Sequence, residues 1–157
     1  MGSAELVLSE IKLTGGESVS RRIDDDQRFG RSVMTGVATG DTLWLQVASK
    51  LTLRSAAAET SMEMALASAL VHAPARVIAM LGRKYPLEKV CRIPFLEADT
   101  TRVMAYHDSA AAAIAAISDT LLVAKRDRCR VQLDAARDWK MSRVDPKYII
   151  KNKPKAR

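Results

Sequence analysis

Aromatic residues are scarce in this chain of 157 residues, at 4% of the composition, although 48% of the residues are hydrophobic. Glycine is unevenly distributed, because six of the seven glycines lie at or before Gly40 and only Gly82 follows. A β-sandwich or a β-barrel usually needs more aromatic and β-branched residues, and glycine-rich turns between its strands. The many small and aliphatic side chains instead favour helices packed against helices.

Long hydrophobic runs are missing as well, since charged residues interrupt every apolar stretch before the roughly 18–20 residues that span a bilayer. We therefore expect no transmembrane segment. We interpret residues 1–3, Met1-Gly2-Ser3, as a cloning scar before a native sequence that begins near Ala4. Such scars are often installed where a signal peptide was removed, and a native cytosolic N-terminus is the alternative.

The body of the chain lacks a strong charge of either sign, although the formal net charge is +7. Seven basic residues but only one acid fall between Lys140 and Arg157, so the positive charge is concentrated in the tail, residues 142–157. Such a tail can contact nucleic-acid phosphates, an anionic surface or an acidic protein through salt-sensitive ion pairs. The candidate contacts are Lys147, Lys151, Lys153 and Lys155.

Helical periodicity and helix caps cover most of residues 18–141, which we predict to be one helical domain. The clearest helix is expected from Ala56 to about Ala73 behind a Ser55 cap, because Met62, Ala65, Leu66, Ala69 and Leu70 share one face. One further helix is expected to begin after Ser18 or Asp24 and to end at Thr39, and another to follow the Asp41 cap and place Trp44 in the core. A short helix is expected over 75–81 after Pro74, and one more turn over 86–90.

Two more helices close the predicted domain, with one long helix as the alternative. The first presents Ala110, Ala113, Ile114, Ile117 and Leu121 on one face, and the second runs from an Asp119 cap to about Trp139. Residues 4–17 are expected to form an extended arm, because Glu10 to Leu13 alternate between polar and apolar residues. The fold class is therefore all-α, an irregular bundle of about five to six helices with a short N-terminal extended arm.

Cysteine is rare, with only Cys91 and Cys129 in the chain. We predict that they form one disulfide, which suits an exported protein that folds in an oxidising compartment. The alternative is a pair of buried free thiols in a cytosolic protein.

Catalytic, metal-binding and cofactor motifs are also missing, so we expect no enzyme, metal or cofactor. Neither cysteine has a neighbour at the spacing of metal ligands, and the only histidines are His72 and His107. His72 is expected at the end of a helix in a structural role, and His107 at the start of a helix with better exposure to solvent. The acidic run from Asp24 to Asp26 is interpreted as a solvated helix start.

The segment from Cys91 to Asp99 cannot be helical throughout, because Pro94 interrupts it. An exposed loop with charged and aromatic groups is a plausible recognition element, and its candidate contact residues are Arg92, Phe95, Glu97 and Asp99. The alternative is that Ile93, Phe95 and Leu96 tie the loop to the core.

These observations favour a non-enzymatic protein-binding module, a bacterial exported inhibitor, immunity, chaperone or accessory protein that acts through a loop and a helix face. We expect another protein as its partner and a periplasmic or secreted location. The alternative is a cytoplasmic regulatory or nucleic-acid-associated protein that uses the basic tail. The small-residue face from Ala110 to Ala116 is either core or the seam of a homodimer.

Overall fold

The computed structural model of the protein describes residues 3–97, 99–145, 147–148 and 151. In these residues the secondary structure is entirely helical, with nine α-helices and one 3-10 turn. The first six helices are α1 (Ala4–Thr14), α2 (Gly16–Asp25), α3 (Gln27–Ala38), α4 (Thr42–Lys50), α5 (Ala56–Ala69) and α6 (Pro74–Met80). They are followed by α7 (Leu87–Val90), α8 (Thr100–Ala115), the 3-10 turn η1 (Thr120–Leu122) and α9 (Val123–Val144).

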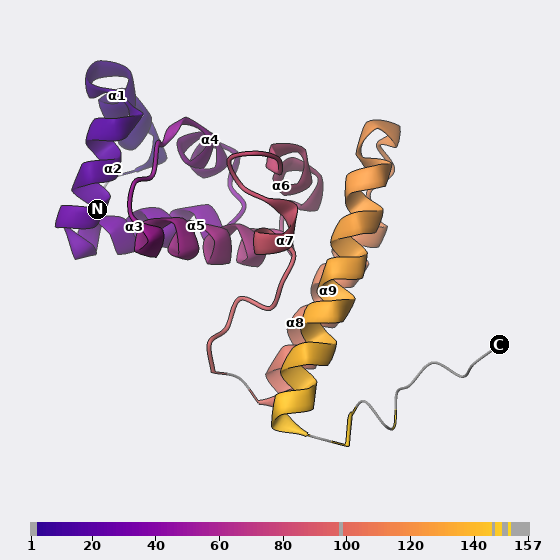
Figure 1. The fold of residues 1–157 in the computed structure, drawn as a ribbon. Helices are drawn as coiled ribbons and strands as arrows, with labels where there is room; N and C mark the ends of the chain where they lie inside the picture. Colours follow the sequence, from indigo (N-terminus) through magenta and orange to yellow (C-terminus); the bar gives the residue numbers. More distant parts are fainter. Residues whose placement is uncertain (1–2, 98, 146, 149–150, 152–157) are drawn as a thin grey trace.

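The arrangement is a bundle of short helices with a long hairpin beside it (Figure 1). Helices α3 and α5 pack closely, and α8 and α9 run antiparallel beside each other. A single apolar core runs through these elements, and its largest fully buried side chains include Leu66, Leu70, Ile78, Ile114 and Leu133. None of the helices in the described part of the chain is long and apolar enough to cross a membrane.

The N-terminal segment is a helix, so the expected extended arm is wrong. Ser3 caps α1 by accepting a hydrogen bond from the backbone N–H of Leu6. Ala4, Val7 and Ile11 are buried along one face of α1, with the spacing of a helix. The alternation that favoured a strand covers only four residues, which is too short to compete with this longer helical pattern.

The segment expected to hold one helix from Ser18 or Asp24 up to Thr39 holds two, because Asp26 separates α2 from α3. The later of the two expected starts lies close to the start of α3. The carboxylate of Asp26 accepts a hydrogen bond from the backbone N–H of Phe29 at 3.0 Å, so this part of the acidic run does start a helix. Together with α1, this break raises the number of α-helices above the expected five to six, whereas α7 is the turn expected over 86–90.

The caps predicted for the central helices are confirmed. Asp41 accepts hydrogen bonds from the N–H groups of Leu43 and Trp44, and Ser55 accepts one from Ala58. Pro74 is the first residue of α6. Helix α5 ends at Ala69, earlier than the expected Ala73. Ala73 itself has a non-helical backbone, as the following Pro74 favours.

The two closing helices are separate, and the apolar face expected to reach Leu121 is shorter. Ala110 and Ile114 of α8 are buried in the core, but α8 ends at Ala115 and Leu121 is 88% exposed within η1. Asp119 accepts a hydrogen bond from Leu121 N–H, and η1 leads directly into α9. Helix α9 extends to Val144 and overlaps the start of the segment expected to be a tail.

Candidate functional site

The two cysteines lie at disulfide distance, as the sequence predicts. Cys91 directly follows the α7 turn, Cys129 lies on α9, and their Cα atoms are 5.3 Å apart. Both side chains are buried. The pair holds the beginning of the 91–99 segment against α9.

The far end of the same segment is held by hydrogen bonds. Lys140 of α9 donates from Nζ to the carbonyl oxygens of Phe95 at 2.6 Å and Leu96 at 3.0 Å. Asp99 accepts a hydrogen bond from the backbone N–H of Arg102 at 2.7 Å and so caps α8. Residues 91–97 are therefore tied to α9 at two points, Cys91 and the Phe95 and Leu96 carbonyls.

Phe95 connects this segment to the core. Its ring meets the ring of Tyr106 edge-on, with the two centroids 5.7 Å apart, and the guanidinium of Arg102 lies 3.8 Å from its centroid. Tyr106 is buried, and its hydroxyl donates to the carbonyl of Ala67 at 2.6 Å. Burial raises the pKa of this Tyr106 hydroxyl, which therefore stays protonated as a donor. Phe95 therefore ties the segment to the core, as the alternative interpretation expects, and its side chain is partly buried.

A groove of about 390 Å³ lies between the segment and α9, and we call it the Trp139 groove. Its apolar walls come from α5, the segment and α9, and its charged edge comes from two basic side chains. The lining residues are Met64, Arg92, Ile93, Phe95, Leu96, Ala136, Trp139 and Lys140.

Two apolar side chains at this groove face solvent, since Trp139 is 54% exposed and Leu96 is 84% exposed. The guanidinium of Arg143 lies 4.1 Å from a ring centroid of Trp139. Arg92, Lys140 and Arg143 therefore surround an exposed apolar surface with positive charge. An aromatic ring and arginines in this arrangement are typical of protein-binding surfaces.

The sequence-predicted contact residues divide into two groups. Arg92 and Phe95 line the groove, whereas Asp99 caps α8 and the exposed Glu97 is not among the lining residues. Lys147 and Lys151 are exposed and also do not line the groove. Lys153 and Lys155 lie outside the described residues.

Trp139 and Lys140 are functional candidates that the sequence reasoning missed. The inward stripe of α9 is set by Cys129, Leu133 and Ala136, and Trp139 falls about a quarter turn away from it at helical spacing. A large aromatic residue displaced from the buried stripe is the signal that could have found this surface.

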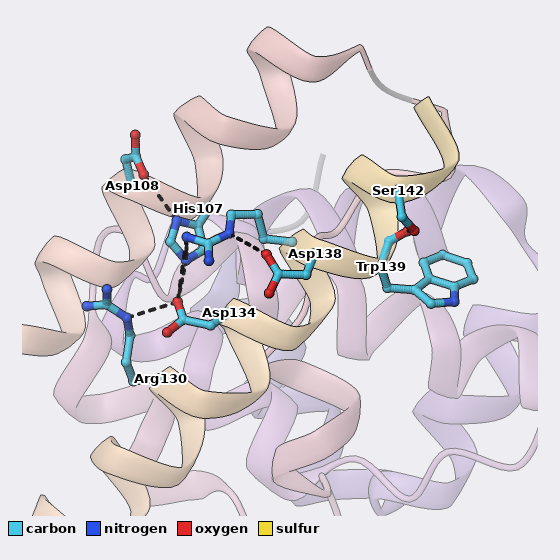
Figure 2. A network of polar contacts seen from close by, with 8 residues as sticks. His107, Asp108, Arg130, Asp134, Asp138, Trp139 and Ser142 are labelled. Atoms are coloured by element: carbon cyan, nitrogen blue, oxygen red, sulfur yellow. Dashed lines mark hydrogen bonds and ion pairs between the residues drawn. The ribbon is translucent and has the colours of Figure 1, made fainter. Parts of the chain in front are cut away.

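A network of polar side chains links α8 to α9 (Figure 2). His107 of α8 is only 2% exposed, with Nε2 at 2.7 Å from Oδ1 of Asp134 and Nδ1 at 3.1 Å from Oδ1 of Asp108. The expected exposure of His107 is therefore wrong. Helix α8 begins at Thr100, so His107 lies well inside the helix, one turn from the buried Val103 and on the side that faces α9.

Two arginines of α9 complete this network. Arg130 Nε donates to Oδ1 of Asp134 at 3.1 Å, and Arg137 Nε donates to Oδ1 of Asp138 at 3.1 Å (Figure 2). Each ring nitrogen of His107 already faces a carboxylate, so the imidazole offers no free nitrogen to a substrate. The network acts as a polar link between α8 and α9 and supports the helix that carries Trp139.

Asp134 is the central acceptor of this link and gives the fold a pH dependence. Partial burial raises its pKa, but hydrogen bonds with His107 and Arg130 and the charges of Arg130 and Arg137 outweigh burial and hold the pKa below its ordinary value of 3.8. A depressed carboxyl pKa stabilises the fold fully above its unfolded-state value, and this contribution disappears as the pH falls through the folded-state pKa.

We therefore expect Asp134→Asn to lower the free energy of unfolding at pH 7, because it weakens the contacts with His107 and Arg130. The loss should be only about 1 kcal/mol, since the side chain is partly exposed and water screens its charge. This difference from the wild type should shrink when urea unfolding is repeated well below the ordinary pKa of 3.8. Asp127→Asn, an exposed carboxylate on the same helix, controls for the loss of one negative charge. An Asp134→Asn deficit that stays constant on acidification contradicts the assignment.

No family model, curated protein or solved structure matches this chain.

Proposed function

We propose that this protein is a non-enzymatic protein-binding module that takes a short acidic segment of a partner protein, with one apolar anchor residue, into the Trp139 groove. The observation that carries the proposal is the half-exposed Trp139 beside the exposed Leu96, with Arg92, Lys140 and Arg143 around them.

The groove suits one anchoring side chain. Its volume of about 390 Å³ is within the range of about 300–1,000 Å³ typical of sites that enclose a small group. Apolar walls from Met64, Ile93 and Phe95 favour an aliphatic or aromatic anchor. Covering Trp139 and Leu96 removes apolar surface from water, which favours binding in proportion to the area covered.

The positive charges at the groove favour a partner that carries negative charge. Arg92, Lys140 and Arg143 are all positive, so carboxylates on either side of the anchor are complementary to them. Complementary charges at an interface increase the rate of association and exclude partners of the wrong sign. A basic or purely apolar segment would lack this advantage.

The backbone of the groove is held before any partner arrives. The Cys91–Cys129 pair and the hydrogen bonds from Lys140 fix the segment on α9, and the His107 network fixes α9 on α8. A surface that is already ordered loses little conformational entropy on binding.

The proposal includes an exported location, periplasmic or secreted, and a role as an inhibitor, immunity, chaperone or accessory protein. A cysteine pair at disulfide distance is compatible with an oxidising compartment.

Selection of a random-peptide display library on the immobilised protein tests the groove. We expect the enriched peptides to contain an aromatic or aliphatic residue flanked by Asp or Glu. A synthetic copy of the leading peptide should bind Trp139→Ala about tenfold more weakly or worse, because removing an interface tryptophan commonly costs more than 1.4 kcal/mol. Arg143→Glu should weaken the same peptide, and fluorescence anisotropy measures each affinity.

Leu121→Ala is the matched control, since Leu121 is an exposed apolar side chain that does not line the groove. Its affinity for the peptide should equal that of the wild type. The proposal fails if no peptide is enriched, or if the enriched peptides bind Trp139→Ala as tightly as the wild type.

The exposed Lys147 and Lys151 support the alternative, a cytoplasmic protein that associates with nucleic acid. It predicts salt-sensitive binding that depends on the tail and is unchanged by Trp139→Ala. The same variant therefore separates the two functions.

A further inference from the structure

A second groove lies along α3. Helices α2 and α3 lie on the opposite side of the fold from α8 and α9 (Figure 1). The walls of the groove come from α2, α3 and the start of α4, and its volume is about 690 Å³. We call it the α3 groove. No residue of the 91–99 segment, α8 or α9 lines it, so it is independent of the Trp139 groove.

Positive charge is concentrated on one side of the α3 groove. Arg28 and Arg31 line it, both are exposed, and neither has an ion-pair or hydrogen-bond partner among the described residues. Their spacing of three residues places both guanidinium groups on the same face of α3. Ser32 and Thr35 add two hydroxyls to this face.

The other two charged side chains that line the α3 groove, Asp26 and Arg22, already have partners. The carboxylate of Asp26 caps α3 through Phe29 N–H, and Arg22 pairs with Glu10 at 2.7 Å while lying 3.9 Å from the ring centroid of Phe29. Arg28 and Arg31 are therefore the cations left available to a ligand.

Trp44 contributes a further donor and an apolar wall. Its ring packs over Gly36, and Nε1 has no hydrogen-bond partner among the described residues. Every buried polar side-chain atom in the described part of the chain has a partner, so this Nε1 is not fully buried. The Trp44 and Phe29 rings give the groove two aromatic sides.

We infer that the α3 groove binds an organic phosphate, with the phosphoryl group on Arg28 and Arg31 and the organic part against Phe29 and Trp44. Two guanidinium groups, two hydroxyls and an indole N–H supply more donors than a carboxylate can use, and arginine pairs with phosphate oxygens in a bidentate manner. The volume of about 690 Å³ exceeds that of a bare phosphate ion and lies within the range of small-molecule sites.

Phenyl phosphate and inorganic phosphate, titrated at constant ionic strength, test this inference. The two indole N–H signals in a ¹H–¹⁵N spectrum report on the binding, and the Trp139→Phe variant assigns them. We expect phenyl phosphate to shift the Trp44 signal saturably, with an affinity about tenfold higher than that of inorganic phosphate because of its ring. Arg31→Gln should weaken phenyl phosphate by about tenfold.

Arg21→Gln is the matched control, because Arg21 is exposed on α2 and does not line the groove. It removes the same charge and should leave the affinity within a factor of about two. Equal thermal unfolding midpoints of the two variants show that both are folded. The inference is overturned if the Trp44 signal does not saturate, if Arg31→Gln binds like Arg21→Gln, or if phenyl phosphate binds no tighter than inorganic phosphate.

Discussion

Removal of the Cys91–Cys129 bridge is expected to lower the free energy of unfolding by about 3–4 kcal/mol, by the loop-entropy relation for a separation of 38 residues. The double variant Cys91→Ala/Cys129→Ala leaves a larger conformational ensemble to the unfolded chain. It also removes the covalent link between the end of α7 and α9. Urea unfolding of the variant, followed by circular dichroism, measures the loss.

Reductant provides the control for this experiment. The unfolding midpoint of the wild type should fall towards that of the double variant when dithiothreitol is added, whereas the double variant should not respond. Protein isolated from its native source and alkylated without reduction should carry no label on either cysteine. Two labelled thiols, or a midpoint insensitive to reductant, would remove both the bridge and the main support for export.

The disulfide pairing could be predicted because two cysteines allow only one intramolecular pair. The caps Asp41 and Ser55 and the helix start at Pro74 could be predicted for a related reason, since each acts on the first turn of its own helix. These signals are local, and no distant part of the chain has to be known to interpret them.

Helix α1 and the break at Asp26 could have been found by local reasoning. The helical spacing of Ala4, Val7 and Ile11 was hidden by a shorter alternating stretch, and the capping ability of Asp26 was assigned to the acidic run as a whole. Both errors come from choosing the wrong one of two competing local patterns.

The candidate site could be predicted only in part, because its geometry depends on contacts between residues that are far apart in the sequence. Lys140 meets the carbonyls of Phe95 and Leu96 across more than forty residues, and His107 meets Asp134 across 27. Periodicity places each residue on a face of its own helix. It does not show which face meets the 91–99 segment, and so Trp139 and Lys140 were missed.

Gly36 illustrates the same limit within α3. By propensity alone it weakens the helix, and replacing it with alanine should stabilise the chain by about 1 kcal/mol. In the fold, however, a Cβ at this position would overlap the Trp44 ring, with Nε1 only 2.7 Å away. The glycine provides the space in which Trp44, the residue expected to anchor the core, packs half-buried against it.

We therefore expect Gly36→Ala to lower the free energy of unfolding by about 2 kcal/mol, the overpacking cost of about 3 kcal/mol less the gain in helix propensity. The effect should depend on Trp44, because a smaller side chain there removes the overlap. In a Trp44→Leu background, Gly36→Ala should cost little or stabilise, which gives a coupling energy of about 2 kcal/mol in a double-mutant cycle measured by urea unfolding. Equal costs in both backgrounds would mean that Gly36 is not kept small by Trp44. A large coupling would show that tertiary packing, and not helix propensity, determines the residue at this position.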